Sequence, residues 1–412
     1  MFKRIPGTKD ILPAEVILWQ RIEEKARSIF SRYNFQEIRP PLIEEASLFN
    51  RSLGESAEIV RKQMFLVRNQ EDLYALRPEG TASVVRAYVE NSLDKTAGFV
   101  KLYYMGPMFR LERPQKGRLR QFHHIGVEAI GSQDPDLDVE IISLADELLR
   151  SFSVQGHKIK VNSLGCPKDK SALNSYLRGE LKGKADALCD DCKIRHENNV
   201  LRILDCKNES CRRVVESLKI GDFHLCPECK GHFARVVSGL DSLKIGYEVA
   251  HHLVRGLDYY TRTVFEITHD ELGAQDAVGA GGRYNNLVGE LGGPDLGAVG
   301  FAFGVERLLL AAKLPPQAPS GGLVYLICLG DEAKKEGVKI LDSLRKGGVA
   351  ADTDYEARSL KAAMRKANDL GAGFALIIGD DELKKNAATV KNMASGEQRE
   401  VALTELTKEL KC

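Results

Sequence analysis

The sequence predicts an α+β domain built on an antiparallel sheet, interrupted by a helical Cys-rich insertion and followed by a small α/β domain. Three observations lead to this prediction. Residues 99–131 and 257–306 are rich in Tyr, Phe, Val and Gly with short apolar runs, as expected of strands joined by loops. Between them, residues 166–246 are helix-forming and rich in cysteine. After the Pro- and Gly-rich segment 313–322, apolar strands alternate with helices, which is typical of an α/β domain.

Length, charge and the distribution of apolar residues limit the classes of protein to which the chain can belong. The chain has 412 residues, enough for two or three domains that each bury a core. Its net charge of +1 neither favours nor excludes a nucleic-acid partner, because only the local distribution of charge decides that. The first residues, "MFKRIPGTKDILP", contain no apolar signal segment, and no window approaches the roughly 18 apolar residues of a membrane span. We therefore expect a cytoplasmic protein without a membrane partner.

The first element expected is an amphipathic helix over residues 14–34, because its apolar residues recur close to a 3.6-residue period. The prolines of "RPP" then favour an extended segment, since a proline disfavours helix for the residue before it.

A basic hairpin tip is expected next. The Pro and Gly of "RPQKG" indicate a turn, so residues 102–112 and 118–130 are predicted to form two strands. Guanidinium groups bind phosphate oxygens in a bidentate manner, which makes this tip a candidate phosphate site. A solvated basic hairpin is the alternative, against which the apolar flanks and Phe122 count. Apart from Glu112, the charged residues of the tip are Arg110, Arg113, Lys116, Arg118 and Arg120.

The insertion contains three pairs of cysteines, Cys189-x2-Cys192, Cys206-x4-Cys211 and Cys226-x2-Cys229. Without a secretory signal, such cysteines are expected to be thiols or metal ligands rather than disulfides. The spacing is typical of zinc sites, and it predicts about one zinc per chain. Reduced cysteines packed in a small helical lobe are the alternative, and both stay open. The candidate zinc ligands are Cys189, Cys192, Cys226 and Cys229.

The glycine-rich segment 279–293, "GAGGRYNNLVGELGG", suggests backbone that lies close to something else. Glycine costs roughly 0.5–1 kcal/mol in an ordered element, so such a run is expected where the chain needs positive φ or close contact. A flexible linker is disfavoured by the apolar residues in it, and the spacing does not fit a dinucleotide-binding turn. We expect a ligand to dock here, with Tyr284 or Arg283 beside it.

The last part of the chain is expected to contain the strand "LVYLICL", helices over 332–346 and 357–370, and the strand "FALIIG". The second helix is amphipathic, so one face should pack in the core and the other should face solvent or phosphate. The core face consists of Leu360, Ala363, Met364, Ala367 and Leu370, and the outer face carries Lys361, Arg365 and Lys366.

Four segments resemble known motifs. "FRLE" with "RQFHHIGVE" is similar to motif 2 of class II aminoacyl-tRNA synthetases, and "GAVGFAFGVERLLL" is similar to motif 3. "LVRGLDYYTRTVFE" and "AGGRYNNLVGELGG" resemble the two histidine-specific signatures of the histidyl-tRNA synthetase family. The similarity runs from "GTKDILP" through motif 3 and into the last domain. In addition, "FQEIRPPLIEEASLF", with Pro41, resembles motif 1, which in this class lies at a dimer interface.

The resemblance implies a class II catalytic domain over residues 1–320, with the lobe 166–246 inserted, and an anticodon-binding domain over 321–412. It implies ATP-dependent activation of L-histidine, with Mg²⁺, and transfer of histidine to the 3′ end of tRNA(His) by a homodimer. The alternative is an inactive histidine-binding paralogue, the regulatory subunit of ATP phosphoribosyltransferase. That paralogue is expected to lack the terminal domain and "LVRGLDYY", and both are present here. A zinc-ribbon nucleic-acid binder would leave motifs 2 and 3 unexplained.

By resemblance, two arginines are catalytic. Arg110 would hold the ATP α-phosphate, and Arg255 would lie opposite it, where relatives commonly rely on Mg²⁺. Adenine would lie between Phe122 and Arg307, and Arg118 would reach the γ-phosphate. The residues implied in ATP binding are Arg110, Glu112, Arg118, Phe122 and Arg307.

The resemblance also implies a histidine site. Glu128 would accept a hydrogen bond from one imidazole nitrogen and Tyr260 would contact the other, while Glu79 would take the α-ammonium. One position departs from the family pattern, because His124 stands where Gln is usual. A neutral imidazole can still accept a hydrogen bond there, whereas an imidazolium would repel the amine. The residues implied in histidine binding are Glu79, Thr81, Arg110, His124, Glu128, Arg255, Tyr259 and Tyr260.

Overall fold

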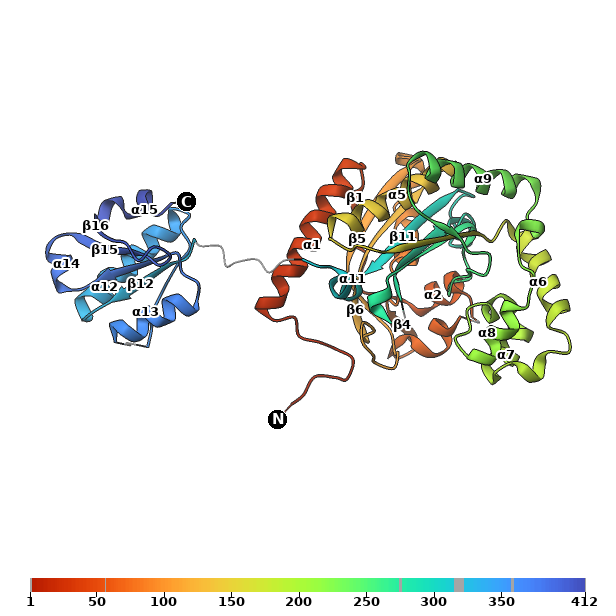
Figure 1. The fold of residues 1–412 in the computed structure, drawn as a ribbon, viewed down its shortest axis with the longest axis horizontal. Helices are drawn as coiled ribbons and strands as arrows, with labels where there is room; N and C mark the ends of the chain where they lie inside the picture. The colour runs from red at the N-terminus through yellow and green to blue at the C-terminus, as the bar shows by residue number, and fades with distance from the viewer. Residues whose placement is uncertain (1, 56, 274–275, 315–321, 357–358, 412) are drawn as a thin grey trace. The chain divides into compact units, whose positions relative to one another are not determined.

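The computed structural model describes residues 2–55, 57–273, 276–314, 322–356 and 359–411, and it forms two compact units, Met1–Leu314 and Pro315–Cys412 (Figure 1). The predicted boundary between residues 320 and 321, and most of the predicted linker, lie outside the described residues. Each unit has its own sheet and its own hydrophobic clusters, so each is described by itself.

The first unit is built on an eight-stranded sheet in the order β1-β5-β6-β11-β10-β9-β7-β8. Its central pairs are antiparallel, and within the described part of this sheet only the edge pairs β1·β5 and β7·β8 are parallel. The expected α+β domain on an antiparallel sheet is therefore confirmed. The strands are β1 (Gln36–Glu37), β5 (Val100–Phe109), β6 (Gln121–Ile130), β7 (Lys158–Ser163), β8 (Glu248–Val249), β9 (Thr261–Thr268), β10 (Ala277–Arg283) and β11 (Ala298–Gly304).

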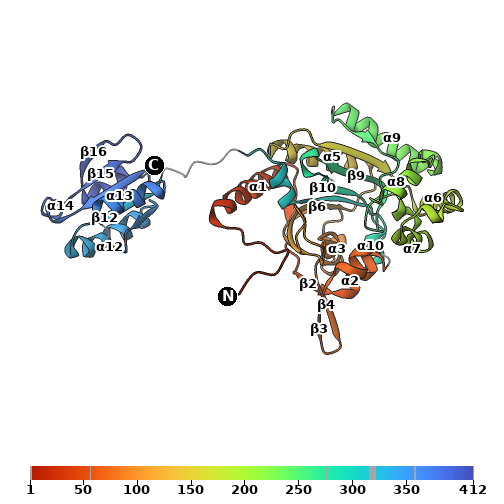
Figure 2. The same ribbon diagram turned by 60° about the horizontal axis from the view of Figure 1, so that its bottom comes forward.

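Helices cover the two faces of this sheet in different ways. One face packs against α1 (Pro13–Arg32), α5 (Pro135–Ser151) and α11 (Val305–Ala311), whose apolar residues share a cluster with those of β6, β9 and β11. The other face carries α2 (Ala46–Leu53) and α3 (Thr81–Glu90) (Figure 2). The helix expected over residues 14–34 is α1, with Trp19, Ile22 and Phe30 buried.

The predicted basic hairpin is present. Strands β5 and β6 pair from Val100↔Ile130 to Phe109↔Gln121, and the backbone N–H of Arg110 donates to the carbonyl of Arg120 across the tip (2.8 Å). The strands end a few residues earlier than expected, so the arginines of the tip belong to the loop rather than to the sheet. The loop at the tip of the hairpin therefore carries the basic residues and lies beside the motif 3 segment.

A small second sheet in the order β2-β4-β3 projects from the first unit (Figure 2). Its strands are β2 (Ile43–Glu45), β3 (Phe65–Asn69) and β4 (Asp72–Leu76). Several of its large apolar side chains are exposed, and so is that of Leu42 just before it.

The Cys-rich insertion is confirmed between β7 and β8. It consists mainly of α6 (Pro167–Leu181), α7 (Asp190–Asn198), the short 3₁₀ turn η3 (Val200–Ile203), α8 (Glu209–Glu216) and α9 (Pro227–Ser242). The last helix returns to the large sheet of the first unit, because Val236 and Leu240 are fully buried in the cluster that α5 shares with that sheet. Gly239 permits this contact, since a Cβ there would lie 2.5 Å from a methyl carbon of Val139.

The second unit is an α/β domain, as expected. Its five-stranded sheet has the order β13-β12-β14-β15-β16, with β12 parallel to β13 and β14. The strands are β12 (Val324–Cys328), β13 (Ala351–Thr353), β14 (Phe374–Ile378), β15 (Ala387–Asn392) and β16 (Gln398–Ala402), and the helices are α12 (Asp331–Lys346), α13 (Leu360–Asp369), α14 (Asp380–Lys384) and α15 (Leu406–Glu409).

The predicted core face of the second helix is only partly correct. Ala363 and Ala367 of α13 are fully buried, but Leu360 and Leu370 are 40% and 38% exposed. The helix begins at Leu360 and ends at Asp369, so both leucines stand at its ends, beyond the part of the helix that covers the sheet. Residues 357–358 of the predicted helix lie outside the described residues.

Across the described ranges of both units, each helix is too short or too polar to cross a bilayer.

Candidate active site

A cavity opens on the face of the large sheet between the hairpin of β5 and β6, the strands β10 and β11, and the start of α3. All residues that the resemblance assigns to histidine or ATP line this one cavity. They are Glu79, Thr81, Arg110, Glu112, Arg118, Phe122, His124, Glu128, Arg255, Tyr259, Tyr260 and Arg307.

Glu128 is at the buried end of the cavity, 1% exposed on β6. Its carboxylate accepts hydrogen bonds from the hydroxyls of Thr81 (2.7 Å) and Tyr284 (2.5 Å). Burial raises the pKa of this carboxyl to about 8, even though these hydroxyls favour its charged form. Gly300 leaves room for the group, because a Cβ there would lie 2.1 Å from Oε2 of Glu128.

Glu79 joins this network at the start of α3. Its carboxylate accepts from the backbone N–H groups of Thr81 (2.7 Å) and Ala82 (2.9 Å). Negative charge at a helix N-terminus is stabilised by the aligned peptide dipoles. Burial nevertheless raises the pKa of Glu79, whose side chain is almost fully enclosed. The same carboxylate therefore orders the helix and faces the cavity.

Two arginines at the tip of the β5–β6 hairpin line the same cavity. Nε of Arg110 donates to the carbonyl of Pro78 (2.8 Å), and its guanidinium carbon is 5.2 Å from the centroid of the Phe122 ring. Nη1 of Arg118 forms an ion pair with Glu112 (3.2 Å). Both guanidinium groups are thus held in position before any phosphate arrives.

Arg255 approaches from the loop before β9. One end of its guanidinium forms an ion pair with Glu266, while its Nε is buried and has no hydrogen-bond partner in the described part of the chain. A buried donor without a partner costs free energy unless a ligand satisfies it. This atom is therefore a candidate contact for a negatively charged substrate group.

Motif 3 is braced against the hairpin. Arg307 donates from Nε to the carbonyl of Gly117 (3.1 Å) and from Nη1 to the carbonyl of Ala277. Glu306 accepts from the backbone N–H of His123 (3.0 Å). These contacts hold Arg307 and Phe122 at the same cavity.

His124 is neutral in this environment. Burial and the charges of Arg110 and Arg77 lower the pKa of its imidazole to about 3. Its Nδ1 is buried without a hydrogen-bond partner among the described residues. Of the two outcomes considered from the sequence, the ring therefore matches the neutral one, which can accept a hydrogen bond and does not repel an amine.

We predict that His124→Gln changes little. Because the ring is already neutral from mildly acidic to basic pH, a glutamine supplies a similar polar group and removes no charge. The KM for histidine in pyrophosphate exchange should stay within about threefold of the original value, with the same pH profile between pH 6 and 8. A loss of affinity of 30-fold or more, or an improvement confined to acidic pH, would contradict this.

The glycine-rich segment 279–293 differs from the expectation in one respect. Tyr284 lines the cavity, but Arg283 does not; it is fully buried and bound to Asp138. The glycines of β10 serve mainly the sheet. A Cβ on Gly281 would lie 2.3 Å from the carbonyl oxygen of Gly300, whereas Gly279 faces both the cavity and its neighbouring strand.

The four cysteines predicted as zinc ligands fall into two separate groups. Cys189 and Cys192 lie together with Cys206 and Cys211, whereas Cys226 and Cys229 lie with Cys166 and Asp169. The physical reason is that α7 and α9 begin at different places in the lobe, so their cysteine pairs do not meet. All eight cysteines of the described residues are thiols.

Three functional candidates were missed from the sequence. Tyr104 is fully buried at the cavity, with its hydroxyl 3.5 Å from Glu128. Its ring fits there because Gly80 and Gly126 lack side chains. These three residues come from different segments, so no local sequence pattern predicts their contact. Cys166 and Asp169 had a signal, since "CPKD" repeats the pattern of "CPEC" with one aspartate.

Comparison with known proteins agrees with this geometry. Residues 7–308 match the family described as Histidyl-tRNA synthetase, and residues 323–412 match the Anticodon binding domain. The histidine–tRNA ligase of Halothermothrix orenii is 47% identical over 411 residues, which cover 98% of this chain and 97% of that protein. The corresponding ligase of Desulforamulus reducens is 45% identical over 404 residues, covering 97% and 96%.

Among solved structures, the apo histidyl-tRNA synthetase of S. aureus superposes with a TM-score of 0.82 at 36% identity, over 100% of both chains. The match is therefore continuous through the catalytic sheet, the Cys-rich lobe and the terminal unit. The chain belongs to the histidyl-tRNA synthetase family.

Proposed function

We propose that the protein activates L-histidine with ATP to give histidyl-adenylate and pyrophosphate, and then transfers histidine to the 3′ end of tRNA(His). The observation that supports this most directly is the single cavity that joins the Glu128 network to Arg110 and Arg255. A buried polar site around Glu128 thus opens onto two arginines, which are suited to bind phosphate. The alternative, an inactive regulatory paralogue, fits less well because the terminal anticodon-type domain and "LVRGLDYY" are both present.

In the proposed first step, a carboxylate oxygen of histidine attacks the α-phosphorus of ATP. The bond from that phosphorus to the bridging oxygen breaks, and pyrophosphate leaves with the electron pair. Negative charge grows on the non-bridging oxygens, so cations fixed beside them lower the barrier. Arg110 and Arg255 have this role in our proposal, because their guanidinium groups line the cavity and are oriented by protein contacts.

The buried network is proposed to recognise the imidazole. Glu128 would accept from one ring nitrogen and Tyr260 would meet the other, with Tyr259 packed beside it. Because the pKa of Glu128 is about 8 in the substrate-free protein, binding that requires its carboxylate form would release a proton near neutral pH. Glu79 and Thr81 would receive the α-ammonium, and a ligand without these groups would leave buried polar atoms unpaired.

ATP is proposed to bind on the hairpin side of the cavity. Adenine would stack between Phe122 and Arg307, and Arg118 would contact the terminal phosphate. Mg²⁺ would accompany the phosphates, and the carboxylate of Glu112 in the cavity suits a cation that prefers oxygen ligands. The bound cation would offset phosphate charge, while the arginines orient the α-phosphate.

The experiment that tests this function is histidine-dependent exchange of pyrophosphate into ATP. We expect exchange with L-histidine and none with other amino acids, such as glutamine. A regulatory paralogue would bind histidine in calorimetry without supporting exchange, and that result would overturn the proposal. Charging of tRNA(His) transcripts then tests the second step.

We propose that the protein works as a homodimer in the cytoplasm. The motif 1 segment leads into the small sheet, where Leu42, Ile43, Leu66 and Val67 are 40–53% exposed. Ile43 and Val67 lie on one face of this sheet and Leu66 on the other, and exposed apolar side chains of this kind suit an interface with a second copy of the chain. A monomeric mass at micromolar concentration would contradict the dimer.

The terminal domain is proposed to bind the anticodon end of tRNA. A tRNA held at two sites gains effective concentration, so losing one site is expected to cost about 100-fold or more. We therefore predict that deletion of residues 321–412 spares most pyrophosphate exchange but lowers tRNA charging by this factor. The separate hydrophobic clusters of the two units favour folding of the truncated protein. Equal charging by a folded truncation would show that this domain has another role.

A further inference from the structure

Two groups of metal-ligating side chains lie in and beside the inserted lobe. Within each group, one ligand atom from every residue lies within 4.8 Å of all the others. We propose that each group holds one Zn²⁺, so that the chain carries two structural zinc centres. The lobe centre consists of Cys189, Cys192, Cys206 and Cys211, and the hinge centre consists of Cys166, Asp169, Cys226 and Cys229.

The lobe centre has the size of a mononuclear site. Zinc binds thiolates at about 2.3 Å in a tetrahedron, which places neighbouring sulfur atoms about 3.8 Å apart. The Sγ atoms of Cys189 and Cys206 are separated by 3.8 Å. An iron–sulfur cluster places irons and sulfides between its thiolates and needs them farther apart than this group allows.

The surroundings of the lobe centre suit thiolates. The backbone N–H of Cys189 points to Sγ of Cys211 (3.2 Å), and Nη1 of Arg195 lies 3.9 Å from Sγ of Cys192. Four thiolates and one Zn²⁺ carry a net charge of −2, so a nearby guanidinium and N–H donors stabilise the centre. Cys192 and Cys211 are fully buried, which keeps water from competing for the metal.

The hinge centre is built by two similar helix starts. Cys166 and Cys226 are the N-cap residues of α6 and α9, each followed by proline, while Asp169 and Cys229 lie in the first turns. The Asp169 carboxylate accepts from the backbone N–H groups of Cys166 (3.1 Å) and Cys226 (2.9 Å), which orders both helix starts around it. Each carboxylate oxygen keeps further lone-pair capacity for a metal.

The two centres close different parts of the lobe. The hinge centre ties α6, which leaves the catalytic sheet after β7, to α9, which returns to the catalytic core. The lobe centre ties the starts of α7 and α8 to the end of η3. The elements of the lobe are short, and metal ions commonly supplement the packing of such small elements.

Both centres adjoin the segments that hold the loop of Arg255. Lys170, one residue after Asp169, donates to the carbonyls of Asp258 (3.0 Å) and Tyr260 (3.1 Å). Arg202 of η3 donates to the carbonyl of Arg255 (2.9 Å).

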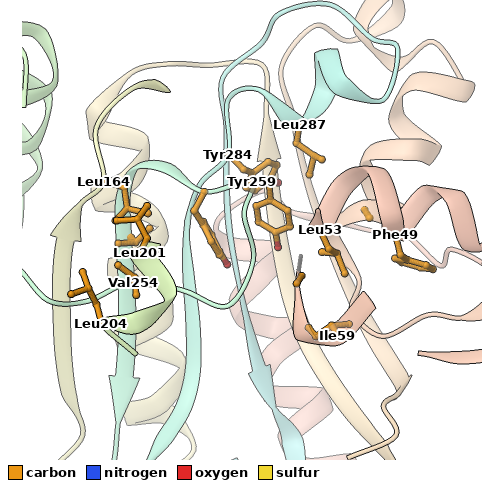
Figure 3. Close-up of a cluster of buried hydrophobic side chains, with 14 of the residues drawn as sticks. Phe49, Leu53, Ile59, Leu164, Leu201, Leu204, Val254, Tyr259, Tyr284 and Leu287 are labelled. Carbon is orange, nitrogen blue, oxygen red and sulfur yellow. The ribbon is translucent and has the colours of Figure 1, made fainter. Parts of the chain in front are cut away.

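Apolar contacts reinforce these hydrogen bonds. Figure 3 shows Leu201 and Leu204 next to Val254 and Leu164, beside Tyr259. Metal removal should therefore loosen the loop that carries Arg255. This link to catalysis rests on the proposed function, whereas the presence of the metal does not.

Metal analysis of the full-length protein tests the proposal. Protein purified under reducing conditions, without exposure to metal-affinity resin, should contain two zinc ions per chain. Cys211→Ser and Cys229→Ser should each retain one. Cys328→Ser is the matched control, because this thiol lies on β12 of the terminal unit and outside both groups; it should retain two. Replacement of zinc by Co²⁺ should give thiolate-to-cobalt absorption in the original protein.

Other outcomes contradict the proposal in separable ways. Original protein that contains no zinc and takes up no Co²⁺ with all thiols reduced overturns both centres. If the original protein contains one zinc ion and only one of the two variants loses it, the centre altered in the other variant is overturned. Chelation should lower pyrophosphate exchange about tenfold or more, reversibly with Zn²⁺. Protein that holds two zinc ions but supports no exchange would contradict the proposed function and leave the metal centres intact.

Discussion

Arg255→Ala is expected to lower histidine-dependent pyrophosphate exchange by about 1000-fold, while histidine still binds. The side chain contributes a cation at the α-phosphate, where charge grows only as the new P–O bond forms. Its Nη1 pairs with Glu266, whereas its Nε is buried without a hydrogen-bond partner in the described ranges, so this nitrogen is available to a substrate oxygen. An interaction that strengthens in the transition state acts on kcat more than on substrate binding.

Two further variants separate charge from geometry in this experiment. Arg255→Lys keeps a positive charge but loses the planar fork, so it should recover only part of the activity. Arg235→Ala is the matched control. This exposed arginine of α9 pairs with Asp136 of α5 and lies outside the cavity. Exchange equal to that of the original protein in Arg255→Ala would remove its assigned role. Unchanged thermal unfolding would establish that the loss is not one of folding.

The predicted site residues that line the cavity belong mostly to short contiguous motifs, which is why the sequence could point to them. Phe122, His124 and Glu128 are spaced by even numbers along β6, so the two-residue period of a strand places them on one face. The sequence therefore indicates that they share the cavity. The side chains from other strands that pack against this face of β6 are harder to predict. Tyr104 reaches Glu128 from the paired strand, and only the register Tyr104↔Gly126 explains why its ring has space there.

Contacts between distant segments were the main source of error. Arg283 ends β10, whose Gly279 lines the cavity, yet its side chain turns to Asp138, 145 positions away in the sequence. The hinge centre also depends on a contact between distant segments, because the backbone N–H of Cys226 donates to Asp169, 57 positions away. Local spacing predicts which cysteines form a pair, but the path of the chain decides which pairs meet.

The second large effect is expected at this buried ion pair. Arg283→Ala should destabilise the catalytic unit by about 3–5 kcal/mol, because it leaves the carboxylate of Asp138 buried without its main partner. Both side chains are fully buried, and Nε of Arg283 donates to both carboxylate oxygens (3.2 and 3.0 Å). Although burial acts to raise it, hydrogen bonds from His232 and Arg283 keep the pKa of Asp138 below its usual value. The carboxyl is therefore charged at neutral pH.

The remaining donors of Arg283 connect three segments. Nη1 donates to the carbonyl of Ser132 (2.8 Å) and Nη2 to that of Asp134 (2.9 Å), just before α5, while Asn285 accepts a further bond (3.3 Å). The guanidinium thus fixes the end of β10 to the turn that begins α5. Loss of this group removes the guanidinium donor of the Ser132 carbonyl and leaves the Asp134 carbonyl with the backbone N–H of Leu137 (3.2 Å), which adds to the cost of the unpaired charge.

Thermal unfolding of the catalytic unit measures the effect, with an expected decrease in Tm of about 10 °C. Lys158→Ala, which breaks an exposed ion pair with Asp270, is the control and should leave the Tm unchanged. A double variant, Asp138→Leu with Arg283→Met, removes both charges and fills their space with apolar atoms. It should recover much of the stability lost in Arg283→Ala, because the largest cost there is one uncompensated buried charge. If the single variant unfolds at the original temperature, the pair does not stabilise the fold. If the double variant is as unstable as the single one, the hydrogen bonds to Ser132 and Asp134 outweigh the charge.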